Sequence, residues 1–473
     1  MFNNIETTGF SASVTQKVNQ TNVCKGKVMK KSYYLDLIEK TLSAYTTAHI
    51  DRYFDDVKRD GLKEHGFPRL TANIGILIAN NRCTDLKERF IAMMDLCCQQ
   101  IPKVTAANEF SVKEIICCLE ELEKASRLGV SHFQIDDGWQ YGKSPNSAVA
   151  KGSFKNIWDN PDYWTPDPDK YPRGLKPVVE RGRELGIEIG LWYNPSIQND
   201  FADWEKDAAA IVGLYRKYGI RIFKIDGLGI PSKKAEKNLR RLFDRVLEQT
   251  DNAVMFNLDA TAGRRGGYHM FNEYGNIFLE NRYTDWGNYY PYWTLRNLWM
   301  LSKYVPAEKI QVEFLNKWRN DRKYEGDTFA PSVYSFEYVF AVSMAGQPLA
   351  WMEASNLPEE AFDIAPVIKG YRDVSADFHS GVILPIGEEP SGRSWTGFQS
   401  ICSDKEGYVL VYREASERGA AFVKTWLSEG VKVKFTPVLG YGKAFTAKVD
   451  RNGEIRFALP EENSYALYRY TSF

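Results

Sequence analysis

Acids and amides end several short apolar stretches of this 473-residue chain. In "FKIDG", Phe223 and Ile225 alternate with Lys224 and Asp226, the two-residue period of a strand, before the chain turns at Gly227. Burying either charge without a partner is costly, so a strand that ends in both needs a reason. Four other stretches end alike: "FQIDDGWQ" (Asp136, Asp137, Trp139), "GLWYNPS" (Trp192, Asn194), "FNLDATAGRRGG" (Asn257, Asp259, Arg264) and "LENRYTDW" (Glu280, Asn281, Arg282, Asp285, Trp286).

This combination of acids and tryptophans suits the cleavage of a glycosidic bond. That reaction uses two carboxylates, one as nucleophile or base and the other as proton donor. Tryptophan faces cover the apolar side of a sugar ring, while acids and amides bind its hydroxyl groups. A single buried acid is usually structural, but five strand ends on one rim favour a site. Apart from Trp139 and Trp192, each tryptophan is explained equally well by core packing.

A barrel of alternating strands and helices would bring these ends together. Between residues 111 and 352 helical and strand patterns alternate, with successive strands mostly 25 to 35 residues apart, which is typical of a (β/α)8 barrel of the TIM type. Helices are predicted over 111–128, 174–185, 203–218 and 232–249, and strands at "SHFQI", "IEIGLWY", "RIFKI", "AVMFNL", "NIFLEN", "KIQVEF" and "QPLAWM". These are seven strands, whereas a closed barrel has eight. The candidates for the missing first strand are "CQQIPKVTAANEF" and, further upstream, "TANIGILIA" at 71–79.

The composition changes along the chain, which predicts several domains. Six of the seven Cys lie at or before Cys118, and all twelve Trp lie at or after Trp139. After residue 378 short strands with turn signals, including Asn452-Gly453 between two alternating segments, predict hairpins in an antiparallel β-sandwich. The predicted domains are a disordered tail (1–30), a helical region (31–110), an α/β barrel with the site (111–377) and a C-terminal β-sandwich (378–473).

Charge and composition argue against several partners. Lys plus Arg and Asp plus Glu both total 61, so the chain has no net attraction to nucleic acid or to an anionic membrane. The first 30 residues lack the apolar run of a secretory signal, which predicts a cytoplasmic protein. The five His lack ligand spacing and no C-x-x-C occurs, so we expect reduced thiols and no metal.

Other barrel chemistries have less support in the sequence. A phosphate-binding isomerase would carry a Gly-rich loop after the seventh or eighth strand, and "EFLNKWRN" and "WMEASNLPEE" provide none. "AGRRGG" at 262–267 could bind an anion, but a turn beside a sugar site is the simpler interpretation. No G-x-G-x-x-G opens a strand–helix unit, so no nicotinamide cofactor, and no other cofactor, is expected.

Four motifs in order resemble a known family. "FQIDDGWQ", "GLWYNP", "FKIDG" and "RYTDW...YWTLRN" are similar to the family-36 glycoside hydrolases, the α-galactosidase clan. The resemblance spans about residues 111–473 and leaves 1–110 uncovered. It implies a retaining, exo-acting α-glycosidase of α-galactosidase type, which binds an oligosaccharide or glycoside and forms a covalent glycosyl-enzyme.

The resemblance also implies roles for individual residues. The clan's nucleophile matches Asp226, and its acid/base is best matched by Asp285, with Glu280 as the alternative because Arg282 and Asp285 lie one residue closer than usual. Lys224 would favour the ionised form of Asp226, while Asp285 must carry a proton. The substrate would contact Asp136, Asp137, Trp139, Trp192, Asn194, Lys224, Asn257 and Arg282.

Two alternatives share these residues. A transglycosylase of the raffinose-synthase type differs only in binding an acceptor. A carbohydrate-binding or catalytically impaired relative would follow if the barrel lacked its first strand, because an open barrel exposes edges and loosens the site. Nothing in the sequence predicts an oligomeric state. Asn194 stands where many relatives carry an acid, so the sequence does not determine which sugar is bound.

Overall fold

The computed structural model describes residues 113–145, 152–261, 267–279, 289–314, 316–319 and 321–473. The chain divides into two compact units. Among the described residues, one unit contains 113–120 and Ile135–Arg181, and the other contains Glu121–Gln134 and Gly182–Phe473. The predicted tail, the helical region and both candidates for the first barrel strand lie outside the described residues.

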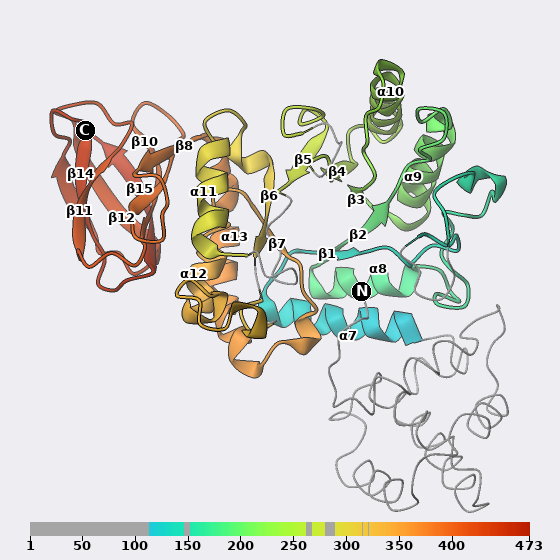
Figure 1. The fold of residues 1–473 in the computed structure, drawn as a ribbon, viewed down its shortest axis with the longest axis horizontal. Helices are drawn as coiled ribbons and strands as arrows, with labels where there is room; N and C mark the ends of the chain where they lie inside the picture. Colours follow the sequence, from blue (N-terminus) through green and yellow to red (C-terminus); the bar gives the residue numbers. More distant parts are fainter. Residues whose placement is uncertain (1–112, 146–151, 262–266, 280–288, 315, 320) are drawn as a thin grey trace, which may run out of the picture. The chain divides into compact units, whose positions relative to one another are not determined.

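A seven-stranded sheet carries most of the polar strand ends (Figure 1). Its strands follow one another in chain order, and from the second to the seventh they pair in parallel. They are β1 (His132–Ile135), β2 (Glu188–Tyr193), β3 (Ile222–Ile225), β4 (Met255–Leu258), β5 (Gly275–Phe278), β6 (Ile310–Phe314) and β7 (Gln347–Ala350). All seven predicted strands are confirmed, most of them starting or ending one to three residues inside the predicted stretch.

Helices connect the strands, as the alternating pattern predicts. They are α7 (Lys113–Leu128), α8 (Lys176–Leu185), α9 (Trp204–Tyr218), α10 (Lys233–Gln249), α11 (Pro291–Leu301), α12 (Phe336–Ala341) and α13 (Ala365–Ser380). Local signals fix their ends: the Ser232 side chain accepts a hydrogen bond from the Ala235 N–H, and Gly219 ends α9 in the left-handed region. The apolar face of α10 packs on β4, where the rings of Phe243 and Phe256 lie 4.9 Å apart.

The sheet is curled, because side chains of strands that are not neighbours touch across its concave face. The Asn257 Nδ2 of β4 donates to Gln134 Oε1 of β1 over 3.5 Å. The Lys224 Nζ of β3 lies 4.1 Å from the ring centroid of Trp351, which directly follows β7. A flat sheet would keep β1 and β4 three strand spacings apart, and β3 and β7 four. This curvature is that of a TIM-type barrel wall.

The C-terminal residues form two antiparallel sheets. The larger has the order β13-β12-β15-β10-β9-β8 and the smaller pairs β11 with β14. Buried residues of both, including Val411, Phe435 and Phe457, share one core, as in a β-sandwich. The strands are β8 (Val382–Gly387), β9 (Trp395–Ile401), β10 (Glu406–Arg413), β11 (Ala420–Lys424), β12 (Lys432–Gly440), β13 (Phe445–Lys448), β14 (Glu454–Ala458) and β15 (Ser464–Ser472).

Two details of the sandwich differ from the sequence prediction. Strands β8 and β9 were not anticipated. The turn at Asn452-Gly453 forms, with Gly453 at a φ of 75°, but it does not close a hairpin. Strand β13 pairs with β12 and β14 pairs with β11, so the chain crosses here from one sheet to the other. A turn dipeptide fixes a local reversal, and side-chain burial then selects each strand's partner.

Candidate functional site at the ends of the parallel strands

The carboxylate of Asp226 is held at the carboxyl end of β3. Its backbone N–H donates to the Tyr193 carbonyl over 2.9 Å, which continues the pairing with β2. The Gly227 N–H donates to Asp226 Oδ1 over 2.6 Å. The Trp192 indole Nε1–H donates to Asp226 Oδ2 over 3.2 Å. Both carboxylate oxygens therefore have donors that fix their orientation.

Gly227 is required by the backbone and by its neighbour. Its φ of 69° lies in the left-handed region, which side chains with a Cβ rarely adopt. A Cβ at this position would also overlap the side-chain oxygen of Asn194. Asn194 is 2% exposed, and its Nδ2 donates to the Pro195 carbonyl over 2.9 Å. The predicted residue Asn194 therefore packs against Gly227, which directly follows Asp226 in the chain.

Polar and aromatic side chains form one row across the sheet. The strand register places Trp192 opposite Lys224, Lys224 opposite Asn257, and Asn257 opposite Asn276. Trp192, Lys224 and Asn257 are 1%, 8% and 8% exposed. The Asn276 Nδ2 donates to Asn257 Oδ1 over 3.2 Å. The structure thus brings together the predicted residues of β2, β3 and β4 in one layer of the concave face.

The residues that follow β1 belong to the compact unit that contains Ile135–Arg181, whereas Asp226 belongs to the second unit. Asp137 accepts hydrogen bonds from Gln140 Nε2 over 2.7 Å and from the Ser144 hydroxyl. Trp139 is fully buried, with its ring 6.1 Å from that of Trp164. Burial, together with the charge of Asp137, raises the pKa of Tyr163 to about 12, so this phenol stays neutral at physiological pH. Contact of Asp136, Asp137 and Trp139 with substrate stays a prediction.

Several predicted residues lie outside the described part of the chain. They are the candidate acid/base Asp285, its alternative Glu280, and Arg282 and Arg264. Their roles stay predictions.

The structure adds side chains that the sequence interpretation did not select. Gln134 and Asn276 extend the polar row, and Glu313 of β6 is 4% exposed. Trp351 contacts Lys224, and its ring stacks on Phe278 at 5.4 Å. The signal that could have found Gln134, Asn276 and Glu313 is a polar residue at every second position inside an apolar strand. Nothing in the sequence links Trp351 to Lys224.

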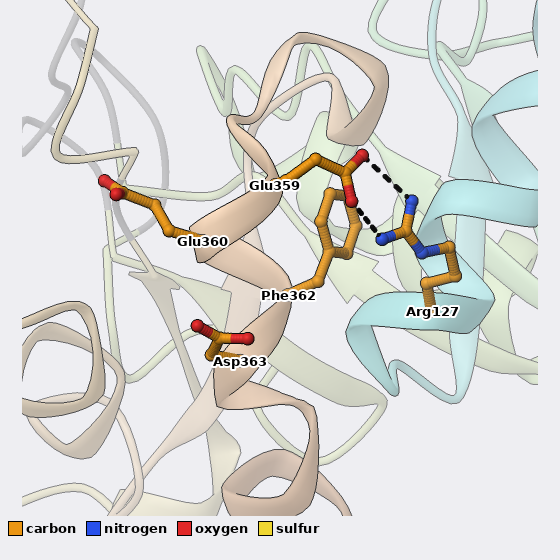
Figure 2. A pocket seen from close by; sticks show the side chains of 5 residues that line it. All are labelled: Arg127, Glu359, Glu360, Phe362 and Asp363. Atoms are coloured by element: carbon orange, nitrogen blue, oxygen red, sulfur yellow. Dashed lines mark hydrogen bonds and ion pairs between the residues drawn. The ribbon is translucent and has the colours of Figure 1, made fainter.

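A separate open pocket of about 560 Å³ lies between the end of α7 and the 3₁₀ helix Glu359–Ile364 (Figure 2). Arg127 forms a two-pronged ion pair with Glu359, and its guanidinium lies 4.2 Å from the centroid of the Phe362 ring. Glu360 accepts a hydrogen bond from the Trp318 indole over 2.9 Å. Among the described residues that line this pocket, none is a predicted site residue, and the one cation, Arg127, is already paired with Glu359.

Neither a metal site nor a membrane span is found in the part of the chain that the structure describes. No group of three or more His, Cys, Asp or Glu side chains there is placed to hold a metal ion. No described helix is both long enough and apolar enough to cross a membrane. Cys118 and Cys402 form no disulfide, and the Cys118 sulfur lies 3.4 Å from the Tyr171 hydroxyl.

The parallel curled sheet followed by a β-sandwich defines a TIM-barrel-like α/β fold, and solved structures share it. The family-36 α-galactosidase AgaA from Geobacillus stearothermophilus superposes with a TM-score of 0.56 at 14% identity. The match covers 78% of this chain and 55% of that one. At this identity the likeness establishes the fold.

Sequence comparison leads to the same group over a short segment. The chain is 38% identical to an α-galactosidase of Escherichia coli over 85 residues, which are 18% of this chain and 10% of that enzyme. It is 31% identical over 110 residues to α-galactosidase C of Emericella nidulans, covering 20% and 14% of the two chains. No family model matches the chain. The chain therefore resembles the family-36 α-galactosidases, and the matched segment spans only a small part of these relatives.

Proposed function

We propose that this protein is a retaining, exo-acting α-glycosidase of the α-galactosidase type. The single observation that carries the proposal is the environment of Asp226: a carboxylate at a parallel strand end, oriented by Trp192 and Gly227, with Lys224 on the same face of β3. Such a carboxylate is suited to attack an anomeric carbon. The resemblance to α-galactosidases supports the choice of sugar.

The proposed reaction has two steps. In the first, an Asp226 oxygen bonds to the anomeric carbon while the glycosidic C–O bond breaks, and Asp285 gives its proton to the departing oxygen. In the second, Asp285 takes a proton from water, which attacks the same carbon and releases Asp226. Two inversions give net retention, which requires the two carboxyl groups to lie about 5 to 5.5 Å apart.

We propose a terminal α-galactosyl group of an oligosaccharide as the substrate. A variant of the Geobacillus enzyme was solved in complex with raffinose, which supports this class of substrate for a protein of the same fold. The partly exposed ring of Trp351 beside the polar row of Lys224 and Asn257 also suits a sugar, which has both apolar and polar surfaces.

A panel of nitrophenyl α-glycosides tests the proposal. We expect release of nitrophenol from the α-galactoside, with the α-anomer of galactose as the first product by NMR. Removing the general acid with Asp285→Asn should lower kcat/KM, which reports the first step, about 10²–10⁴-fold for substrates with poor leaving groups and far less for nitrophenyl glycosides. Galactoside binding without turnover would instead identify a carbohydrate-binding relative. Transfer of galactose to an added sugar in preference to water would identify a transglycosylase.

A further inference from the structure

Trp351 makes a contact that crosses the concave face of the sheet. It directly follows β7, whereas Lys224 belongs to β3, and the sheet order places β4, β5 and β6 between them. The Lys224 Nζ nevertheless lies 4.1 Å from the centroid of the Trp351 ring. This is well inside the range in which an ammonium is attracted to the negative face of an aromatic ring, and tryptophan is the strongest partner.

The indole is itself held in place. Its ring stacks on the ring of Phe278 at the end of β5, with a centroid distance of 5.4 Å and an interplanar angle of 23°. Phe278 is 3% exposed, so this support belongs to the packed wall of the sheet. Two strands and the segment after a third therefore fix the position of one ammonium group.

Lys224 needs such a support because its side chain is long and flexible. A lysine ammonium is a compact charge on a four-carbon stem and has no preferred direction of its own. Here it is 92% buried, since 8% of the residue is exposed, and little water is available to orient it. Lys224 also shares a strand face with Asp226, two residues further along β3.

We propose that Trp351 is a positioning residue, whose ring holds the Lys224 ammonium beside Asp226 through a cation–π contact. The proposal rests on the proposed function, because Lys224 matters for the reaction only if Asp226 is the nucleophile. Trp351 is partly exposed, unlike the fully buried Trp139.

Fluorinated tryptophans at position 351 test the contact most sharply. Each added fluorine withdraws charge from the ring face and weakens a cation–π contact, with almost no change in shape. We expect kcat/KM to fall stepwise with one, two and three fluorines. A packing role predicts no trend, and that result would overturn the proposal.

A double-mutant cycle tests whether Trp351 acts through Lys224. Trp351→Leu should lower kcat/KM about 10-fold, and Trp351→Phe, which keeps an aromatic face, should lower it by no more than about 3-fold. In a Lys224→Met background the Trp351→Leu change should add almost nothing. Losses that multiply in the double mutant would show that the two residues act separately, and would contradict the proposal.

Amine labelling separates failure of this inference from failure of the proposed function. We expect Trp351→Leu to raise the rate at which a small acylating reagent modifies Lys224, followed by peptide mass spectrometry. Lys303, whose Nζ lies 3.9 Å from the Trp299 ring centroid, is an internal control that should keep its rate. If the protein hydrolyses no glycoside but Lys224 labelling rises, the contact between Trp351 and Lys224 is confirmed and the proposed function is wrong. If Lys224 labelling does not change, the positioning role is wrong.

Discussion

Two carboxyl groups that directly follow strands, the partly exposed Asp226 and the buried Glu414, have different surroundings. Asp226 follows a parallel strand, its oxygens accept hydrogen bonds from the Gly227 N–H and the Trp192 indole, and Lys224 lies on the same strand face. Glu414 follows β10 in the antiparallel sandwich, where its Oε2 accepts three backbone N–H groups, from Ser391, Gly392 and Ser394, at 2.8 to 2.9 Å. Its Oε1 is buried without a hydrogen-bond partner among the described residues.

The difference supports a structural role for Glu414 and the proposed catalytic role for Asp226. Burial raises the pKa of Glu414 to about 7, against the opposing effect of its backbone hydrogen bonds. Glu414 is 1% exposed, and its contacts tie a loop to the sandwich, which is a structural role. Asp226 lies instead at the carboxyl end of a parallel strand, beside the row of polar side chains that we propose binds a sugar.

The largest expected effect separates the two acids by activity. Asp226→Asn keeps the shape of the side chain and removes the nucleophile, so kcat should fall about 10⁴-fold or more. Glu414→Gln should leave kcat within about 2-fold. Steady-state hydrolysis of an α-galactoside measures both. The exposed Asp251, whose left-handed backbone suits asparagine equally well, supplies the matched control Asp251→Asn.

The next effect concerns the pH dependence of stability. Because the folded protein holds a proton on Glu414 up to about pH 7, whereas an ordinary glutamate releases it near 4.5, the folded state binds more protons between these values. The free energy of unfolding should therefore fall as pH rises from 4.5 to 7, by roughly 3 kcal/mol, and then level off.

Denaturant unfolding at pH 5 and pH 8 measures this loss. Glu414→Gln should remove most of it, because the amide oxygen can still accept the backbone hydrogen bonds and carries no charge. Glu417→Gln, at an exposed position three residues later, should keep the wild-type pH dependence. An unchanged slope in Glu414→Gln would show that this carboxyl does not titrate as described.

A smaller effect tests the indole donor to Asp226. Trp192→Phe removes the hydrogen bond to Oδ2 and should lower kcat about 10- to 100-fold, the loss expected for one hydrogen bond to a charged group. Trp299→Phe is the matched control, because its indole also donates, over 3.1 Å, to the Ile386 carbonyl in the packed core. That variant should lose stability and keep kcat. Equal kinetic losses in both variants would contradict a specific role for Trp192.

The smallest effect concerns the turn after Asp226. Gly227→Ala and Gly219→Ala both place a Cβ at a positive φ, which costs about 1–2 kcal/mol of stability. Only the first also meets Asn194, whereas the space around Gly219 is open. We expect the larger loss of unfolding free energy in Gly227→Ala, and a reduced kcat only in that variant. Crystal structures of the two variants would show whether Asn194 and Asp226 move.

Much of the fold could be predicted because it depends on local patterns. The sequence around β3 has a two-residue period, and α10 has a Ser cap and one apolar face, so the local sequence is sufficient to predict each element. The row of Trp192, Lys224 and Asn257 can also be predicted, because these residues lie opposite one another once their strands are taken to be parallel neighbours. "GYVLVYRE" also ends in an acid, and only the type of sheet distinguishes Glu414 from Asp226.

What could not be predicted depends on contacts between distant segments. The hydrogen bond from Trp192 to Asp226 depends on the register between β2 and β3. The contact of Trp351 with Lys224 needs a curled sheet, which no local period encodes. The same limit explains the turn at Asn452-Gly453, where a correct local reversal led to the wrong strand pairing.

The central claim is that Asp226 forms a covalent bond with the sugar. A fluorinated α-galactosyl fluoride, which forms the glycosyl-enzyme quickly and releases it slowly, should trap that bond. After proteolysis and mass spectrometry, we expect the added mass of a fluorogalactosyl group on the peptide that carries Asp226, and none in Asp226→Asn. A label on another carboxylate, or turnover with inversion at the anomeric carbon, would contradict the account.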